Sequence, residues 1–225
     1  MKTNRKKKMN IYEAFSIPIA KFKWSQHEKF KEKFLDWMSN ANIAPHSTHH
    51  TSEEVKQFRS PNKDEILLDV LPPELRDELK DFFEIQYTNY FNHILGWAGE
   101  GCKIIDCWLN VGDEGCHQDY HYHANSWVSG CYYLNFDSTH SPLQFQNPFW
   151  NTPIVPCFVG EPLRQTPYNS NFFIPDIEEG DLLMFPSNLV HGYEVSQSPH
   201  NNPRISIAAN FLPKYLGQGK SSVYI

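Results

Sequence analysis

The chain has 225 residues, a formal net charge of -6 and 11 histidines. Its length suits one large domain, which we expect to span residues 10–225. An aromatic fraction of 15% is too high for a disordered protein, and no apolar run is long enough to cross a membrane. The composition therefore predicts a soluble globular protein without a membrane span.

Basic residues are concentrated at the start of the chain. Residues 1–9 contain five Lys or Arg and no acidic residue, so the remainder carries -11, five units more negative than the whole chain. Such an acidic body does not provide the basic groove that follows nucleic-acid phosphates. We expect residues 1–9 to be a flexible tail, with the true start at Met1 or Met9.

Two features of the sequence indicate where in the cell the protein is located: the segment that follows the tail, and the cysteines. The segment that follows the tail is not the apolar stretch of a secretory signal. The cysteines are odd in number and form no C-x-x-C pair, so neither a disulfide framework nor a Cys-ligated zinc finger is expected. They are Cys102, Cys107, Cys116, Cys131 and Cys157. Both features predict a cytoplasmic protein. The sequence does not indicate an oligomeric state.

Residues 10–100 are predicted to be mainly helical. Apolar residues recur at helical spacing over 26–40, and a second helix begins after Pro72-Pro73 and ends at Gly96. The second helix has one long apolar stripe: Leu75, Leu79, Phe82, Phe83, Tyr87, Tyr90, Phe91, Ile94 and Leu95. The polar segment between the helices, which includes 44–52 with three histidines, is predicted to be a loop.

From residue 101 onward the apolar period changes to two, which is typical of strands. The expected strands are 103–111, 127–136, 143–146, 181–185, 189–195 and 204–212. A sandwich or jelly roll over 101–213, backed by the helices and followed by a C-terminal tail over 214–225, is therefore predicted. The proline-rich segment 148–175 interrupts this succession of short strands. It is equally compatible with a lid over a binding site and with an insertion that has no role in binding.

Several metal-binding side chains gather in residues 117–123, just before one of the predicted strands. In an extended chain residues i and i+2 project to the same side, so His121 and His123 can converge on one ion. His117 and Asp119 share this phase and form an alternative H-x-D pair. Alone, a histidine-rich segment is more often a solvated loop than a metal site.

A further candidate ligand follows in the segment 180–191. Gly180 opens a buried strand, Pro186 ends it, and His191 begins the next strand. One isolated histidine on a strand is usually a packing residue. Its position directly after a tight turn, however, allows the neighbouring strands to direct His191 back toward the mouth of the barrel.

The last predicted strand alternates between two faces. Ile205, Ile207, Ala209 and Phe211 share the core face, and Arg204, Ser206, Ala208 and Asn210 share the other. An arginine that faces the interior is costly unless it has an anionic partner, and its planar guanidinium suits a carboxylate. That partner is either a bound ligand or an internal Asp or Glu.

Together these elements resemble the 2-oxoglutarate- and Fe(II)-dependent oxygenases, whose double-stranded β-helix carries an H-x-D/E pair, a distal His and a later Arg. The nearest likeness is to a bacterial and phage subgroup with an H-x-H, His and R-x-S pattern. Its motifs match residues 121–123, 129–133, 145–148, 180–191 and 204–206. Residues 15–19 also look like the opening strand of that subgroup.

The resemblance implies a cupin-like jelly roll that uses Fe(II), 2-oxoglutarate and O2. Such an enzyme hydroxylates a C–H bond and releases succinate and CO2, here on a small-molecule or peptide substrate that the sequence does not identify. His121 and His191 take ligand positions, and His123 stands where the wider family has its carboxylate. Asp119, with His117, remains the other candidate for the third ligand.

The resemblance also implies where the cosubstrate binds. It implies no catalytic side chain other than the residues of the metal centre. Arg204 is the expected partner of the 2-oxoglutarate C5 carboxylate, with Ser206 beside it. Tyr133 is a candidate third contact, and Asn110, in phase with Trp108 and Asp106, is a candidate for the C1 end. Ordinary strand packing explains Tyr133 and Asn110 equally well.

Two other classes share this β architecture. A cupin metalloprotein matches the spacing of the histidine motifs, but residues 124–130 lack the glutamate that its four-ligand site needs. A cupin also leaves the inward Arg204 unexplained. A non-enzymatic jelly-roll binding module, with histidines that meet by coincidence, is the third class.

Overall fold

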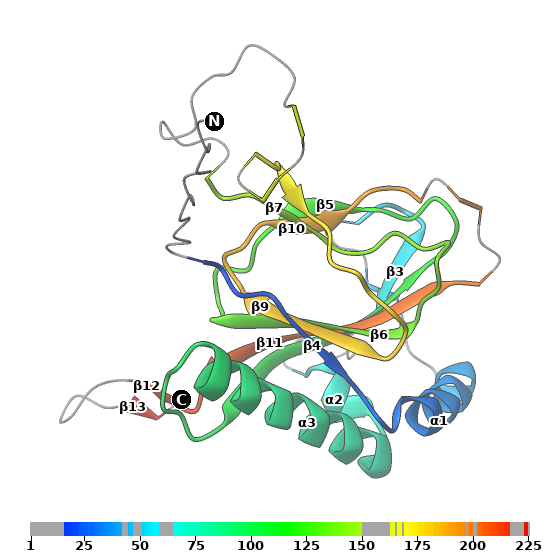
Figure 1. The fold of residues 1–225 in the computed structure, drawn as a ribbon. Helices are drawn as coiled ribbons and strands as arrows, with labels where there is room; N and C mark the ends of the chain where they lie inside the picture. The colour runs from blue at the N-terminus through cyan, green and yellow to red at the C-terminus, as the bar shows by residue number, and fades with distance from the viewer. Residues whose placement is uncertain are drawn as a thin grey trace, which may run out of the picture.

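Two antiparallel sheets form the body of the molecule (Figure 1). The computed structural model describes residues 16–41, 45–46, 51–58, 65–149, 163–164, 166–167, 169–196, 198–199, 202–216 and 223–224. The large sheet has the order β1 (Ala20–Lys23), β9 (Asp181–Pro186), β6 (Val128–Asn135), β11 (Arg204–Pro213), β4 (Cys102–Gly112), β3 (Val55–Phe58) and β2 (Pro45–His46). The small sheet has the order β5 (Gln118–His121), β10 (His191–Tyr193), β7 (Gln144–Gln146) and β8 (Phe172–Phe173). Strands β12 (Tyr215–Leu216) and β13 (Val223–Tyr224) form a separate pair near the C-terminus.

The helices cover the outer face of the large sheet, opposite the small sheet (Figure 1). They are α1 (His27–Asn40), α2 (Leu67–Val70), α3 (Pro73–Thr88) and the π-helix η1 (Asn89–Ile94). The apolar stripe of α3 and η1 packs on outward-facing residues of β4, β6, β9 and β11, such as Leu109, Tyr132, Leu182 and Ile207. None of the described helices is long and apolar enough to cross a membrane. The predicted mainly β architecture backed by helices is confirmed.

A second core fills the space between the two sheets. Its members include Tyr133, Phe145, Phe185 and Tyr193. Strand β11 contributes to both environments, because Ile205, Ile207, Ala209 and Phe211 belong to the outer core while the alternate residues face inward. The predicted alternation of this strand is therefore confirmed.

Three sequence expectations need correction. The polar segment between the helices was predicted to be a loop, but it contains β2, β3 and α2. Strand β3 is ordered by backbone pairing with β4 rather than by its own hydrophobicity, with Val55 opposite Gly112 and Gln57 opposite Asn110. The opening strand predicted at 15–19 begins instead at Ala20, where it pairs with β9. Residue 15 lies outside the described residues. Polar residues 118–121, predicted to precede a strand, form β5 itself.

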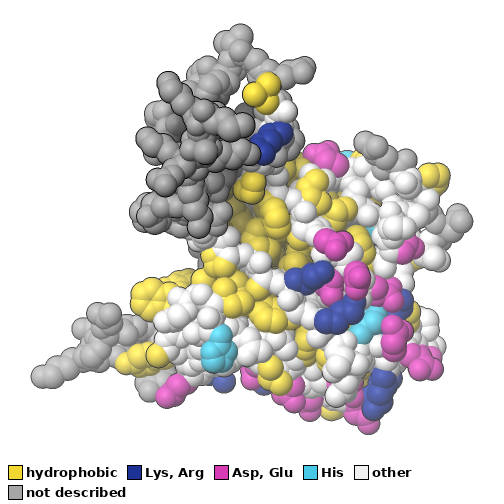
Figure 2. Space-filling view, viewed as in Figure 1, with side chains coloured by type: hydrophobic (Ala, Val, Ile, Leu, Met, Phe, Trp, Pro, Cys, Tyr) yellow, Lys and Arg dark blue, Asp and Glu magenta, His cyan; other side chains and the backbone are white. Residues whose placement is uncertain are grey.

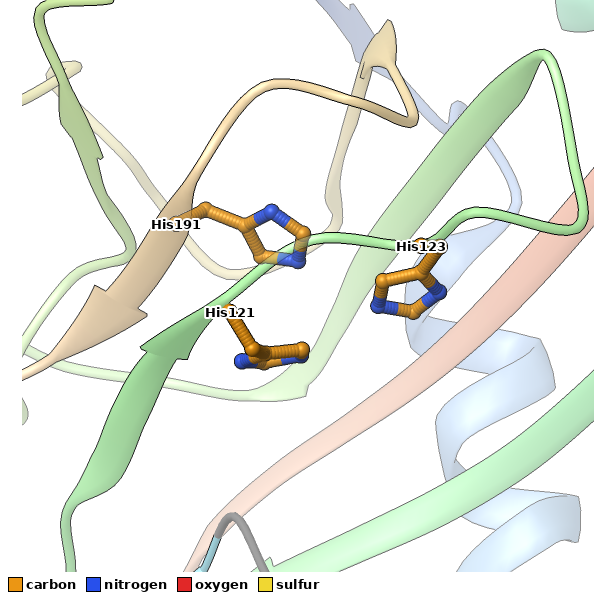
Figure 3. A group of neighbouring side chains, drawn as sticks. All are labelled: His121, His123 and His191. Atoms are coloured by element: carbon orange, nitrogen blue, oxygen red, sulfur yellow. The ribbon is translucent and has the colours of Figure 1, made fainter.

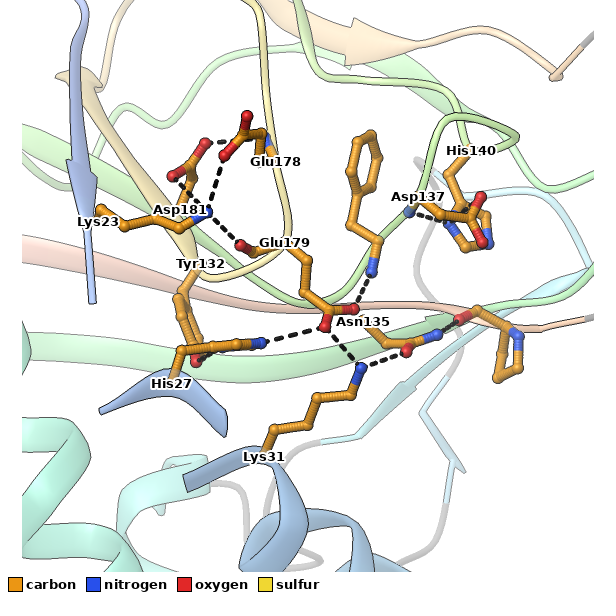
Figure 4. Close-up of polar contacts among 12 residues, drawn as sticks. Lys23, His27, Lys31, Tyr132, Asn135, Asp137, His140, Glu178, Glu179 and Asp181 are labelled. Atoms are coloured by element: carbon orange, nitrogen blue, oxygen red, sulfur yellow. Dashed lines mark hydrogen bonds and ion pairs between the residues drawn. The ribbon is translucent and has the colours of Figure 1, made fainter. Parts of the chain in front are cut away.

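A polar network fixes α1 to the turn before β9 (Figure 4). Glu179 accepts hydrogen bonds from Lys31 Nζ at 2.7 Å and from the Phe136 backbone N–H at 3.0 Å, and its carboxylate lies 3.2 Å from His27 Nε2. The turn requires a glycine at position 180, whose φ is 84° and whose added Cβ would lie 2.8 Å from the His27 ring. These contacts hold the helical layer against the sheet that carries the site.

The tail over 1–9, His49, His50, Cys157 and Trp150 lie outside the described residues. Of the proline-rich segment, residues 150–162 are also outside them. The described cysteines are Cys102, Cys107, Cys116 and Cys131, and all four are buried thiols without a disulfide.

Candidate metal and anion site

Three histidines converge at the open end of the small sheet (Figure 3). His121 is the last residue of β5, His191 is the first residue of β10, and His123 follows two residues after His121. The ring centroids are 4.6 Å apart for His121 and His191, and 5.2 Å apart for each pair that includes His123. One nitrogen of each ring lies within 4.8 Å of the others, which is the spacing of ligands around a single ion.

Backbone carbonyls orient two of the three rings. His121 Nδ1 lies 2.7 Å from the Asp119 carbonyl oxygen, and His191 Nδ1 lies 2.7 Å from that of Leu189. A ring that donates from Nδ1 presents Nε2 as the metal-binding nitrogen, the arrangement usual for histidine ligands. His123 is held differently, because the Trp108 ring stacks on it with centroids 5.6 Å apart and planes 20° apart.

The charge state of His191 also suits a metal ligand. Burial, followed by the nearby His121, lowers the pKa of His191 to about 3. The imidazole is therefore neutral at physiological pH, which is the form that binds metals. Imidazoles are ligands for Fe, Ni, Cu and Zn, so the side chains present fit a first-row transition-metal ion.

Gly192 allows the two histidine-bearing strands to meet. His191 is paired directly with His121 across β5 and β10. A Cβ on Gly192 would lie 2.7 Å from the Gln118 carbonyl oxygen and 3.0 Å from that of Asp119, which are backbone atoms that cannot turn aside. A side chain at this position would separate the strands, so the glycine sets the distance between the His121 and His191 rings.

The structure places the alternative pair outside this cluster. The Asp119 side chain is exposed, and only its backbone carbonyl contacts a member of the cluster. His117 is half-buried, and within the described residues its Nδ1 has no hydrogen-bond partner. The histidines that the structure brings together are thus His121, His123 and His191.

The inward arginine is buried at the start of β11. Arg204 is 2% exposed; its Nη1 donates to Ser206 Oγ at 3.1 Å and its Nε donates to the Ser141 carbonyl oxygen at 3.1 Å. The guanidinium carbon lies 4.2 Å from the ring centroid of Tyr193 and 5.2 Å from that of Tyr133. Aromatic rings and neutral oxygens therefore surround this cation.

One nitrogen of the guanidinium has no hydrogen-bond partner among the described residues. Among the described residues, Arg204 Nη2 is buried without a hydrogen-bond partner, and no Asp or Glu forms an ion pair with Arg204. An unpaired buried cation is costly. The internal acidic partner considered from the sequence is not found in this part of the chain, and the leftover donor fits the carboxylate of a ligand.

The arginine and the histidines line one shared cavity. Its walls include Asn110, His121, His123, His191, Arg204 and Ser206. The three strands β3, β4 and β11 bring Gln57, Asn110 and Ser206 to one level, and Gln57 Nε2 donates to Asn110 Oδ1 at 2.8 Å. The cavity therefore connects the histidine cluster with the guanidinium.

Tyr133 occupies a supporting position. Its ring packs beside the Arg204 guanidinium, its hydroxyl accepts a hydrogen bond from the Leu143 backbone N–H at 3.2 Å, and it is not among the residues that line the cavity. Burial raises the pKa of its hydroxyl far above the usual value, so it stays protonated. Trp108 lines the cavity, whereas Trp127 is exposed.

Two residues near the site were missed in the sequence. Tyr193 forms the closest ring contact of Arg204, and its alternation with His191 along one strand was a signal that pointed to the same interior. Gln57 had no such signal, because its short strand is ordered through backbone pairing with β2 and β4.

Comparisons with known proteins agree with this geometry. Residues 106–210 match the model of a family described as "Putative 2OG-Fe(II) oxygenase". No curated protein matches the sequence. A prolyl-4-hydroxylase from Pseudomonas putida has a similar structure, with a TM-score of 0.55 and 11% identity over 88% of this chain and 94% of that chain.

Two further solved structures are similar. HygX from Streptomyces hygroscopicus, with nickel, 2-oxoglutarate and hygromycin B bound, has a TM-score of 0.58 and 12% identity over 88% of this chain and 83% of that chain. The α-ketoglutarate-dependent epimerase SnoN from nogalamycin biosynthesis has a TM-score of 0.57 and 8% identity over 92% of this chain and 80% of that chain. At these identities the structural likeness shows a shared fold.

Proposed function

We propose which residues of this protein carry its chemistry. The family match confirms the resemblance to the 2-oxoglutarate- and Fe(II)-dependent oxygenases, and the protein is an oxidoreductase of this kind. His121, His123 and His191 would hold Fe(II). When bound, iron supplies the oxidation in which O2 and 2-oxoglutarate convert a C–H bond to C–OH and yield succinate and CO2. Hydroxylation is the outcome that we propose for the substrate.

The remaining site residues would bind and orient the cosubstrate. Arg204 donates to the carboxylate of 2-oxoglutarate that is remote from the metal, and Ser206 fixes the guanidinium beside it. Asn110 lines the wall between Arg204 and the histidines, where it can contact the C1 end. Tyr133 stabilises Arg204 through its ring and excludes water from behind the guanidinium.

The single observation that carries this assignment is the leftover donor of Arg204. A buried guanidinium with one nitrogen unpartnered, in the same cavity as three converging imidazoles, is a costly arrangement without a ligand. A dicarboxylate that spans the metal and Arg204 satisfies both ends. Neither a cupin-like metal site nor a non-enzymatic binding module explains why a buried arginine lines the same cavity as the histidines.

Three neutral imidazoles also make the metal site unusual. The common facial triad of two histidines and one carboxylate supplies one negative charge to the metal, and three imidazoles supply none. Here His123 takes the third place, and Trp108 fixes its ring by stacking. We propose His123, rather than Asp119, as the third ligand because its ring faces the other two (Figure 3).

The place of action and the domain organisation are also part of the proposal. Four buried free thiols support a reducing compartment, and we assign the protein to the cytoplasm. We assign residues 10–225 to a single domain, since one core joins the helical layer to the large sheet and a second core joins the two sheets. The substrate is taken to be a small molecule or peptide rather than a nucleic acid, in keeping with the acidic body of the chain.

The assignment is tested by anaerobic addition of Fe(II) and 2-oxoglutarate to the full chain, followed by visible absorption spectroscopy. Chelation of Fe(II) by 2-oxoglutarate gives a metal-to-ligand charge-transfer band. We expect the band in the wild type, its loss in His121→Ala, and a large rise in the 2-oxoglutarate concentration needed by Arg204→Met. Absence of the band in the wild type, or an unchanged band in both variants, would overturn the assignment. His93→Ala, an exposed histidine on η1, is the matched control.

A further inference from the structure

Residues 137–141, which we call the β6 turn, follow strand β6 and contain the buried His140 (Figure 4). The next residue, Ser141, provides the carbonyl oxygen that accepts a hydrogen bond from Arg204 Nε at 3.1 Å. We propose that His140 is a positioning residue of the cosubstrate site, which fixes Arg204 where the remote carboxylate of 2-oxoglutarate binds. This inference rests on the proposed function, which makes that carboxylate the ligand of Arg204.

Both ring nitrogens of His140 form hydrogen bonds with the backbone. The side chain is buried, and Nδ1 lies 3.0 Å from the Asp137 backbone nitrogen. Because a backbone N–H can only donate, Nδ1 is the acceptor of this bond. Nε2 therefore carries the proton, and it donates to the Asn202 carbonyl oxygen at 2.8 Å. The ring thus connects the β6 turn to the segment that leads into β11.

This connection closes a ring of contacts around the arginine. Arg204 Nε is bonded to the carbonyl of Ser141, the neighbour of His140, and His140 is bonded to Asn202, two residues before Arg204. The Phe136 ring contacts both side chains, with its centroid 5.6 Å from that of His140 and 5.9 Å from the guanidinium carbon. The backbone and the guanidinium of Arg204 are therefore both fixed to the same turn. A guanidinium that is already held in place loses less conformational entropy when it binds a carboxylate.

Side chains replace the backbone ladder at the start of β11. The pairing of β11 with β6 begins at Ile205, opposite Asn135. Before that pair, Asn135 Nδ2 donates to the Pro203 carbonyl oxygen at 2.7 Å (Figure 4), and His140 Nε2 donates to that of Asn202. The segment that leads into Arg204 is thus held on this side by two side chains, one from β6 and one from the β6 turn.

The charge of the protein makes the position of this guanidinium important. The chain beyond residue 9 carries -11, and acidic side chains are spread over the face shown in Figure 2. Such a surface disfavours the approach of a dianion, so the binding of 2-oxoglutarate depends on short-range contacts. Among the described residues, Arg204 is the one Lys or Arg that lines the cavity. A displaced Arg204 therefore has no second cation in the lining to replace it.

The test compares two 2-oxo acids in the full chain loaded anaerobically with Fe(II). 2-Oxoglutarate has the remote carboxylate, and 2-oxopentanoate has a methyl group in its place. Both chelate the metal through the 2-oxo acid end, so the charge-transfer band measures the dissociation constant of each. We expect His140→Phe to raise the dissociation constant of 2-oxoglutarate about tenfold and to leave that of 2-oxopentanoate within about twofold of the wild type. An equal loss for both acids, or a loss for neither, would overturn the inference.

Two further variants separate the hydrogen bonds of His140. His140→Gln places an amide donor near the position of Nε2, so 2-oxoglutarate binding should return to within about threefold of the wild type. His140→Asn keeps an acceptor near the position of Nδ1 but is too short to reach the Asn202 carbonyl, and it should behave like His140→Phe. It also decides the question if His140→Phe does not fold. Weak binding in His140→Gln, or normal binding in His140→Asn, would contradict a role that runs through Asn202.

Tyr90→Phe is the matched control. Tyr90 is buried in the helical layer, and its hydroxyl donates to the Pro18 carbonyl oxygen at 2.8 Å. The variant therefore removes one side-chain hydrogen bond to a backbone carbonyl, as His140→Phe does at Asn202, but outside the cavity. Both dissociation constants should stay unchanged. A loss of 2-oxoglutarate binding as large as that of His140→Phe would show a general effect of destabilisation and contradict the inference.

A double variant shows whether His140 acts through the arginine. His140→Phe combined with Arg204→Met should bind 2-oxoglutarate as weakly as Arg204→Met alone, because no guanidinium is left to position. Additive losses would contradict the inference. The wild-type band checks the proposed function in the same samples. A normal band that His140→Phe does not weaken overturns the inference alone, whereas a missing band overturns the proposed function and this inference with it.

Discussion

His121 and His191 are direct partners across two antiparallel strands, although 70 residues separate them in the sequence. Their ring centroids are 4.6 Å apart, and each ring is turned by a backbone carbonyl two residues earlier in its own chain segment. The metal-binding geometry is therefore part of the strand register. A change of register by one residue would turn one of the two rings to the opposite face of the sheet.

The first prediction concerns the metal ligands. His121→Ala and His191→Ala each remove one imidazole, so we expect the dissociation constant for Ni(II) or Co(II) to rise by at least about a hundredfold. Isothermal titration calorimetry at fixed pH measures this change, and circular dichroism confirms that the fold is retained. His93→Ala should bind metal like the wild type. Metal affinity that stays unchanged in both site variants would contradict the assignment.

The second prediction distinguishes the two candidates for the third ligand. His123→Ala is expected to lower metal affinity about as much as His121→Ala, because its ring faces the cluster. Asp119→Ala is expected to stay within about threefold of the wild type, since the mutation keeps the backbone carbonyl that holds His121. The reverse order of affinities would identify Asp119 as the ligand.

The third prediction concerns the glycine between the strands. Gly192→Ala introduces a methyl group 2.7 Å from the Gln118 carbonyl oxygen, so β5 must move away from β10. We expect weaker metal binding and a loss of about 1–3 kcal/mol in the free energy of unfolding, the range typical of overpacking. Urea denaturation and metal titration measure the two effects. Gly99→Ala is the comparison outside the site: its added Cβ would lie 2.9 Å from the Phe91 ring and 3.6 Å from Asn92 Oδ1, so metal binding should stay unchanged there.

The fourth prediction follows from the buried guanidinium. Saturating 2-oxoglutarate binds the folded state only, so at a hundred times its dissociation constant it should stabilise the Ni(II)-loaded wild type by about 2.7 kcal/mol. Arg204→Met removes the partner of the carboxylate, and the same 2-oxoglutarate concentration should then leave the melting temperature nearly unchanged. Differential scanning calorimetry with and without 2-oxoglutarate measures this. Arg76→Met, on the outer helix α3, should keep the full stabilisation.

The fifth prediction concerns the pH dependence of folding. Burial favours the neutral form of Glu179, but hydrogen bonds from Lys31, the Phe136 N–H and His27 outweigh it and lower its pKa below the ordinary 4.5. A lowered pKa in the folded state stabilises the protein above pH 4.5, and this contribution is lost as pH falls through the lowered value. Glu179→Gln should therefore be less stable than the wild type at pH 7, by about 1–3 kcal/mol.

The difference between Glu179→Gln and the wild type should shrink steadily as the pH falls below 4.5. Urea denaturation between pH 3 and pH 7 measures it. Glu178→Gln, whose side chain is 71% exposed, is the neighbouring control and should change stability little at any pH. A constant difference between Glu179→Gln and the wild type over this range would contradict the proposed linkage.

The sequence predicted the elements whose own pattern determines their structure. The period of two over 204–211 correctly separated the core residues from Arg204 and Ser206, because a strand between two others must bury one face in each layer. The stripe of α3 likewise predicted a helix with one buried face. In both cases the local pattern and the final packing agree.

Elements that depend on a distant partner could not be predicted in this way. Strand β3 is short and half polar, and backbone pairing with β2 and β4 orders it. The pairs His117 with Asp119 and His121 with His123 have the same spacing, so periodicity cannot choose between them. The choice is made by the register of β5 against β10, which aligns His121 with His191. The roles of these residues as ligands remain predictions.

Strand β11 divides its residues between two tasks according to whether their numbers are odd or even. The odd positions from Ile205 to Phe211 hold the helices to the sheet, and the even positions from Arg204 to Asn210 line the cavity. Ala208 can therefore be exchanged for other small side chains without disturbing the outer core, whereas Asn210 also accepts a buried hydrogen bond from Ser129 Oγ at 2.8 Å. A directed-evolution library restricted to position 208 would alter the shape of the cavity while the odd positions preserve folding.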